Sequence, residues 1–272
     1  MSHAVPSSSV QPRPSAPAGS RGSTPRTPRA IADSLHYDGD FIWAFDSYKD
    51  IVLAVAREYG LKRHFEIGGG RDPLFSPDDL ARHDFSVAIN DISEHELALA
   101  PDGFEKVLCD ISAPNAATAI GAGRYDFAYC RMVMEHVRDV PQMWRNVAAL
   151  LQPGGVALSF FPTLFAPPFV VNRLMPERLT HSALVTLFPE RAAHGGDPKF
   201  PAFYDHCRSS EQVIAPMLAE AGFSDVTILP FYGYAYFWKI PGLKQIDAAF
   251  TRLAREKDWR TFSSFAYVIA RK

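Results

Sequence analysis

Residues Glu66-Ile67-Gly68-Gly69-Gly70 decide the fold, because they end a short apolar run and then turn the chain. Consecutive glycines let the backbone bend sharply and come close to a ligand without side-chain collision. In open α/β sheets such a turn follows the carboxyl end of a strand, where ligands bind. A glycine turn without a ligand has the same pattern, so the surrounding residues decide between the two interpretations.

Short apolar runs alternate with helical stretches around this turn. The expected strands are Arg63 to Ile67, Phe85 to Ile89, Glu105 to Cys109, Tyr125 to Cys130, Val156 to Phe161, Asp225 to Phe231 and Ser263 to Ala270. Strands that alternate with helices indicate an α/β fold with a doubly wound, mostly parallel sheet.

Helices are predicted from apolar spacing and from capping residues. Apolar residues three and four apart predict one amphipathic helix from Asp40 to Tyr59, ahead of the sheet. Ser93 can cap a helix, with Glu96 three residues on, and Asp78-Asp79 are typical first-turn acids. The other expected helices are Ser93 to Ala100, Val140 to Leu151, Ser210 to Ala221 and Leu243 to Glu256.

The chain divides into an arm and one folded domain. Residues 1–30 are rich in Ser, Pro and Arg with almost nothing to bury, which is typical of a disordered arm. Residues 31–272 are expected to form a single domain. Within it, the irregular and proline-rich stretch 162–208 is an insertion after the fifth strand, and long irregular segments of this kind often serve as lids.

Composition limits the classes of partner. The net charge is -2 over 272 residues and no dense basic stripe is present, so we expect no nucleic-acid partner. The three cysteines lack the spacing of a zinc site, so we expect no metal. No apolar run reaches the roughly 18 residues of a membrane span, and no secretory start is visible. We therefore expect a cytoplasmic protein without stable membrane insertion.

Acidic residues follow neighbouring expected strands at the same edge of the sheet. Asp91 lies about twenty residues beyond the glycine turn, where a carboxylate can accept hydrogen bonds from both hydroxyls of a ribose. Asp110 follows the third strand in the same way and can meet the amino edge of an adenine. Glu66 can reach a ligand ammonium group directly or through water. These acids together suit a cationic nucleoside.

A nicotinamide dinucleotide is the competing ligand for a glycine turn. Its pyrophosphate needs a helix N-terminus free of nearby acid and a third glycine for close helix packing. Here the turn continues Arg71-Asp72-Pro73, which makes that helix start awkward. A dehydrogenase is therefore the less favoured interpretation.

With these residues in register, the chain resembles the class I S-adenosyl-L-methionine (SAM)-dependent methyltransferases, of the small-molecule type 11/12-like group. The matching segments are Glu66-Ile67-Gly68-Gly69-Gly70, Asn90-Asp91-Ile92-Ser93, Cys109-Asp110-Ile111, Tyr125-Asp126-Phe127-Ala128-Tyr129-Cys130, Met134-Glu135-His136-Val137 and Leu150-Leu151-Gln152-Pro153-Gly154-Gly155. Asp72 departs from the pattern, since many members have a third glycine there.

The resemblance implies a Rossmann-like sheet of seven strands, the last antiparallel and inserted beside the sixth, with SAM across its first half. It implies cofactor binding by Glu66, Gly68, Gly69, Gly70, Asp91, Ile92, Asp110, Ile111 and Arg131. His136 is the candidate catalytic base, because the turn after the fourth strand lies between cofactor and acceptor in this family. The same histidine can instead shape the pocket without moving a proton.

The resemblance also implies the reaction. We expect methyl transfer from SAM to a small-molecule or saccharide acceptor at a hydroxyl oxygen, by an enzyme that can form a homodimer. A SAM-binding partner or regulatory protein without catalysis is the alternative. Further polar or aromatic candidates near the acceptor are His181, His194, Tyr204, Asp205, His206 and the run Phe231, Tyr232, Tyr234, Tyr236, Phe237 and Trp238.

Overall fold

The computed structural model describes residues 25–165, 201–234 and 242–272, and in these residues seven strands form one sheet. The strands are β1 (Arg63–Ile67), β2 (Ser86–Asp91), β3 (Glu105–Leu108), β4 (Tyr125–Arg131), β5 (Leu151–Pro162), β6 (Asp225–Phe231) and β7 (Phe265–Arg271). Their order is β3-β2-β1-β4-β5-β7-β6. All neighbours are parallel except β7, which runs antiparallel to both β5 and β6. The expected topology, including the antiparallel last strand, is confirmed.

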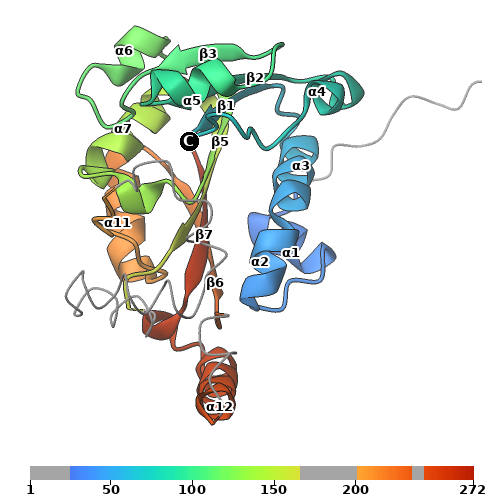
Figure 1. Ribbon diagram of the computed structural model, residues 1–272, viewed down its shortest axis with the longest axis vertical. Helices are drawn as coiled ribbons and strands as arrows, with labels where there is room; N and C mark the ends of the chain where they lie inside the picture. The colour runs from blue at the N-terminus through green and yellow to red at the C-terminus, as the bar shows by residue number, and fades with distance from the viewer. Residues whose placement is uncertain (1–24, 166–200, 235–241) are drawn as a thin grey trace, which may run out of the picture.

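Helices cover both faces of the sheet. They are α1 (Pro28–Ser34), α2 (Phe41–Asp46), α3 (Tyr48–Tyr59), α4 (Pro77–His83), α5 (Glu94–Leu99), α6 (Ala116–Ile120), α7 (Val140–Leu150), α11 (Glu211–Ala221) and α12 (Leu243–Glu256), with short 3-10 turns η1 (Met134–His136) and η2 (Arg260–Phe262). Figure 1 shows α1, α2 and α3 on one face and α6, α7 and α11 on the other, while α12 projects from one end. None of the described helices is long and apolar enough to cross a membrane.

The sheet carries a hydrophobic core on each face. Along β5, Ala157 and Phe161 enter the core beneath α7 and α11, while Leu158 and Phe160 enter the core beneath α2 and α3. Burial on both faces explains why the strands read as continuous apolar runs rather than alternating ones. The second core is largely aromatic, with the rings of Phe160 and Tyr267 centred 5.0 Å apart.

The helix ends follow the capping residues that the sequence predicts. Ser93 Oγ accepts a hydrogen bond from the Glu96 N–H at 3.3 Å, at the start of α5. Asp79 completes a capping box with Ser76 at the start of α4. Gly222 ends α11 in the left-handed conformation, with a φ of 105°.

The two largest corrections to the predicted elements concern the first helix and the fifth strand. The helix expected over Asp40 to Tyr59 is interrupted at Ser47, which ends α2 by donating its N–H to Trp43 O and begins α3. The fifth strand starts at Leu151, because an irregular register near Tyr125 brings the Pro-Gly-Gly segment into the sheet.

The arm ends earlier than residue 30. Thr27 caps α1, which begins at Pro28, and Arg26 forms an ion pair of 2.8 Å with Glu58 on α3. A partner 32 positions away in sequence is invisible to local composition. Residues 1–24, and residues 166–200 of the predicted insertion, lie outside the described residues.

Candidate cofactor and acceptor site

The glycine turn after β1 is closed around its neighbours. Gly68 has a φ of +69°, and a Cβ atom there would collide with the Val133 side chain. Gly70 has a φ of +43°, and a Cβ atom there would lie 2.9 Å from Asp91 Oδ2. Both positions therefore need glycine for conformation and for space. The backbone at Gly70 lies directly against the carboxylate at the end of β2.

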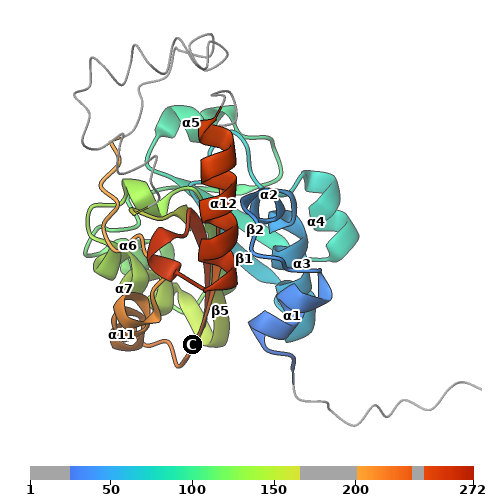
Figure 2. The same cartoon turned by 90° about the horizontal axis from the view of Figure 1, so that it is seen from below.

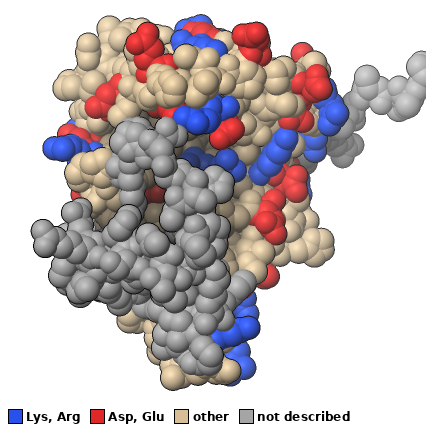
Figure 3. Space-filling model, in the orientation of Figure 1, with Lys and Arg blue, Asp and Glu red and all other residues tan. Residues whose placement is uncertain are grey.

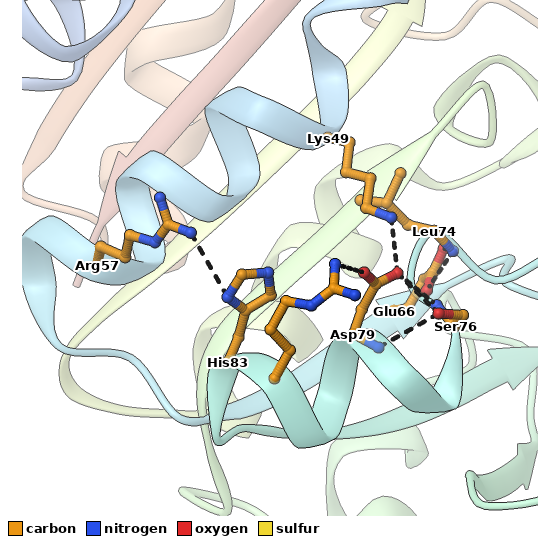
Figure 4. Close-up of polar contacts among 8 residues, drawn as sticks. Lys49, Arg57, Glu66, Leu74, Ser76, Asp79 and His83 are labelled. Atoms are coloured by element: carbon orange, nitrogen blue, oxygen red, sulfur yellow. Dashed lines mark hydrogen bonds and ion pairs between the residues drawn. The ribbon is translucent and has the colours of Figure 1, made fainter.

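Glu66 lies beneath this turn. Its side chain is buried, and its two carboxylate oxygens accept the Leu74 N–H at 2.9 and 3.1 Å (Figure 4). Burial raises the pKa of Glu66 to about 7, opposed by the Leu74 hydrogen bond and the positive charge of Arg131. Glu66 thus fixes the loop that follows the glycines, and its contact with a ligand ammonium group stays a prediction.

The far end of the loop is fixed to α3 and α4. Lys49 Nζ on α3 lies 2.7 Å from Asp79 Oδ2, and Ser76 donates both N–H and O–H to the same carboxylate (Figure 4). The Lys49 hydrogen bond and those from Ser76 hold the pKa of Asp79 well below its usual range. The chain from Glu66 to Asp79 is therefore held by carboxylates at both ends.

Asp91 is half-buried at the end of β2, as the sequence predicts. Its Oδ1 accepts the Ser93 N–H at 2.9 Å. Burial, with the nearby charge of Glu96, raises the pKa of Asp91, and backbone N–H groups oppose the shift. The next side chain, Ile92, is 59% exposed. A carboxylate and an exposed apolar side chain thus lie side by side at this edge.

An ion pair that the sequence analysis did not single out joins the glycine turn to α5. Arg71 Nε and the Glu96 carboxylate are 2.6 Å apart, and a second nitrogen of Arg71 lies 2.5 Å from the other oxygen. This two-point contact is the strong geometry for a guanidinium and a carboxylate. It links the residue after Gly70 to the helix after Asp91, so it holds the two sides of the site together.

The third strand end differs in detail from the prediction. β3 stops at Leu108, two residues before Asp110, because the Asp110 carboxylate accepts the N–H and O–H of Ser112 at 2.8 and 2.7 Å and turns the chain. Asp110 is exposed. The Ile111 side chain is buried in the core, so only its backbone remains for the predicted cofactor contact.

Arg131 and His136 lie on the segment that follows β4. Arg131 ends the strand with an exposed side chain, and Met132 turns the chain with a φ of +58°. His136 lies on η1, with its side chain 34% exposed. His136 Nδ1 is 3.0 Å from the Pro201 carbonyl oxygen, which can only accept. In the neutral ring Nδ1 therefore carries the proton and Nε2 keeps its lone pair.

Glu135 is a candidate that the sequence analysis quoted only within a motif. The side chain is buried, and Oε2 has no hydrogen-bond partner among the described residues. Burial raises the pKa of Glu135 to about 8, so the group is largely protonated at neutral pH. Its Oε1 lies 3.8 Å from His136 Nε2. In the sequence, the only feature that could have singled out Glu135 is its place next to His136 in the quoted motif. The burial of its carboxyl group cannot be seen in the sequence.

The remaining polar and aromatic candidates do not form one group in the described structure. His206 Nδ1 lies 2.8 Å from Asp205 Oδ1, so these two neighbours contact each other. Tyr232 donates its hydroxyl to Asp258 at 3.0 Å, and Phe231 is buried in the aromatic core. The candidates outside the described residues are His181, His194, Tyr236, Phe237 and Trp238.

A cavity of about 940 Å³ lies at the opposite edge of the sheet. Its lining includes Arg63, Ser86, Glu105 and Tyr125, the first residues of four strands. Arg124, which also lines it, is paired with Glu105 at 2.5 Å. Ligands of open α/β sheets bind at the carboxyl ends of strands, so this cavity is not the predicted cofactor site. Among the described residues no cluster of His, Cys, Asp and Glu suited to a metal is found.

Comparisons with known proteins show the family to which the chain belongs. A family model described as a methyltransferase domain matches residues 42–228. Among solved structures, a SAM-dependent methyltransferase from Archaeoglobus fulgidus is 15% identical, with 86% of this chain and 100% of that chain covered and a TM-score of 0.48. The DszA carbon methyltransferase is 15% identical, with 84% of this chain and 54% of that chain covered and a TM-score of 0.52. No curated protein matches the chain.

The fold is a Rossmann-like α/β fold, with the glycine turn and the Asp91 carboxylate together at the carboxyl edge of the sheet. The chain belongs to the methyltransferase domain family and is a SAM-dependent methyltransferase. The residues fit SAM in one decisive respect. Because residue 70 is glycine, no side chain at this position covers the Asp91 carboxylate. A ribose can therefore approach the carboxylate from this side.

Proposed function

We propose that the enzyme transfers the methyl group of SAM to a hydroxyl oxygen of a small molecule or saccharide. The observation that carries the proposal is the close approach of Gly70 to the Asp91 carboxylate, at the same edge of the sheet where His136 follows β4. SAM, when bound, supplies an electrophilic methyl group on a sulfonium. The protein has to hold the acceptor in line with that methyl and keep water out.

For the cofactor, we propose that Asp91 accepts hydrogen bonds from the ribose hydroxyls. Exposed Ile92 then packs on one face of the adenine, and Asp110 and the Ile111 backbone lie at its amino edge. Glu66 and Arg131 lie on the methionine side. A buried carboxylate with a pKa of about 7 ionises readily beside a cation, which supports Glu66 as the balancing charge.

For the acceptor, we propose His136 Nε2 as the base. The Pro201 carbonyl holds Nδ1–H, so Nε2 presents its lone pair to an acceptor hydroxyl. An acceptor hydroxyl there would give its proton to Nε2 as its oxygen took up the methyl group that SAM would supply. Neighbouring Glu135, whose Oε1 lies 3.8 Å from Nε2, is largely protonated and uncharged at neutral pH, so the proton taken up by His136 leaves to water rather than to Glu135.

A substitution at His136 tests the proposal. The full chain is incubated with methyl-labelled SAM and a panel of sugars, phenols and aliphatic alcohols, and labelled product is measured as a function of pH. We expect His136→Gln to lower kcat by roughly 10²–10⁴-fold, with SAM affinity unchanged. Full activity in His136→Gln would exclude the base. SAM binding without turnover on any acceptor would favour the regulatory alternative.

A further inference from the structure

The helix α12 has an exposed apolar stripe. Ile246 is 68% exposed and Leu253 is 41% exposed, and they lie seven residues apart on one face of the helix, with half-buried Phe250 between them. Trp259 and Phe262, each 41% exposed, follow in the next turn. We name these five residues the α12 patch. Contiguous exposed apolar side chains on one face mark an interaction surface.

The aromatic members of the α12 patch form one cluster. The Phe250 ring centre lies 5.4 Å from that of Phe262 and 6.4 Å from that of Trp259. The Trp259 and Phe262 rings are 6.2 Å apart. The patch therefore continues from α12 onto η2 as a connected surface rather than as scattered side chains.

Another side of α12, next to the patch, makes contacts to the protein body through buried Asp247 and Ala254, and several of the contacts of this segment are polar. Asp247 is buried and accepts a hydrogen bond from Tyr234. Asp258, just beyond the helix, accepts the Tyr232 hydroxyl at 3.0 Å, and Arg255 lies 3.8 Å from Asp40. A surface helix of a globular protein normally turns its apolar stripe inward. Here polar groups anchor the helix and much of the apolar stripe faces outward.

The α12 patch lies at the same edge of the sheet as the candidate cofactor site. The segment containing α12 and η2 joins the end of β6 to the start of β7, and Phe231 pairs with Phe265 there. Because β6 is parallel to β1 and β2, this junction lies at the same edge of the sheet as Gly70 and Asp91. Figures 1 and 2 show α12 projecting beyond the sheet at this end, with its length open to the outside.

The charge around the α12 patch is mainly positive. Lys244, Arg252 and Lys257 form no ion pair with any described residue, and Glu256 is the one acid among them that is also unpaired. Figure 3 shows basic side chains gathered on the lower end of the molecule, where α12 lies. Pairing with a second copy through this face would bring like charges together. An anionic surface is the complementary partner.

We propose that α12 and η2 dock reversibly on an anionic lipid surface. An amphipathic helix with Lys and Arg on its polar face and Trp, Phe and Leu on its apolar face is suited to lie in the plane of a headgroup layer. Ile246, Leu253, Trp259 and Phe262 enter the boundary between headgroups and acyl chains, while Lys244 and Arg252 face the phosphates. This docking is independent of which acceptor the enzyme methylates.

Sedimentation of the full chain with vesicles tests the proposal. Vesicles of phosphatidylcholine alone are compared with vesicles that also contain phosphatidylglycerol, at low and at high salt. We expect binding to the anionic vesicles, weakened by salt, and a fall of roughly ten-fold or more in the partition coefficient for Ile246→Ser with Leu253→Ser. Leu99→Ser, which changes another exposed leucine on α5, is the matched control and should bind as the wild type does.

Two further measurements make the outcome decisive. The charge-reversal variant Lys244→Glu with Arg252→Glu should also release the protein from anionic vesicles, and SAM titration should show that each variant is folded. The emission of the wild type should shift to the blue on binding, and Trp259→Phe should lose that shift while still binding. Equal binding by the Ile246/Leu253 variant, or no binding by the wild type, overturns the proposal. A wild-type dimer that this variant converts to a monomer, without vesicle binding, would assign the patch to a second copy instead.

Discussion

At the scale of single residues, two glycines with the same backbone conformation have different neighbours. Gly70 and Gly60 both have a positive φ, of +43° and +67°. A Cβ at Gly70 would meet the Asp91 carboxylate, whereas a Cβ at Gly60 would meet nothing within 4 Å. A side chain would therefore strain the backbone at both positions. Only at Gly70 would it also collide with a residue of the candidate cofactor site.

Substitution of these two glycines separates the two effects. We expect Gly70→Ala to weaken SAM binding by roughly ten-fold or more, because the added methyl displaces the carboxylate that holds the ribose. Gly60→Ala should lower the free energy of unfolding by about 1 kcal/mol and leave SAM affinity unchanged. Calorimetric titration and urea unfolding measure the two quantities. Equal SAM affinity in both variants would contradict the assigned position of the ribose.

Glu135 provides a prediction about pH. Its pKa rises from 4.5 in the unfolded chain to about 8 in the fold, so the native state binds the proton more tightly. The stabilising contribution is complete below pH 4.5 and is lost as pH rises toward 8. Glu135→Gln should remove part of this loss, on the order of a few kcal/mol.

Urea unfolding of wild type and Glu135→Gln across this pH range measures the difference. The wild type should lose stability from pH 5 to 8 more steeply than the variant, with Glu66 accounting for part of the residual slope, since its pKa is also raised. Parallel slopes in the two proteins would show that the Glu135 carboxylate is solvated or paired in solution.

At the scale of secondary-structure elements, the sequence predicted the helices and strands well where local chemistry determines them. β1, β6 and α12 have the predicted bounds because their apolar residues mark them, and Gly222 ends α11 where the sequence predicts. The break at Ser47 was not predicted, since apolar spacing continues through it. The added length of β5 depends on pairing with β4 and β7, which no local pattern contains.

The same distinction applies to the site. Asp91 and the glycine turn were found because strand ends and glycines are visible in the sequence. Burial of Glu66 and Glu135 and the ion pair between Arg71 and Glu96 depend on tertiary packing. Residues whose role follows from their backbone position were therefore predictable, and residues whose role follows from burial were not.

Capping of α4 gives a prediction at this scale. Ser76 caps the helix through its side chain, whereas Ser210 begins α11 without a side-chain cap hydrogen bond. We expect Ser76→Ala to lower the free energy of unfolding by about 1 kcal/mol and Ser210→Ala to change it by a few tenths. Urea denaturation compares the two. A larger effect at Ser210 would contradict the capping geometry that fixes the loop between Glu66 and Asp79.

At the scale of the whole molecule, chemistry is gathered at one edge of the sheet. The glycine turn, Asp91, His136 and the junction that carries α12 all lie at the carboxyl ends of β1, β2, β4 and β6. The opposite edge holds the 940 Å³ cavity, whose lining includes the first residues of four strands. Two charged residues of this lining, Glu105 and Arg124, pair with each other. Strand direction therefore places the candidate site residues at one edge of the sheet and the cavity at the other.

Calorimetric titration of the wild type and Asp91→Ala with SAM, S-adenosylhomocysteine and NAD tests the central claim most directly. The account predicts saturable binding of SAM and S-adenosylhomocysteine but not of NAD, and a loss of about 1–3 kcal/mol of SAM binding free energy in Asp91→Ala. Asp102→Ala, which removes an exposed carboxylate outside the site, should bind as the wild type does. Unchanged SAM affinity in Asp91→Ala, or binding of NAD alone, would contradict the account.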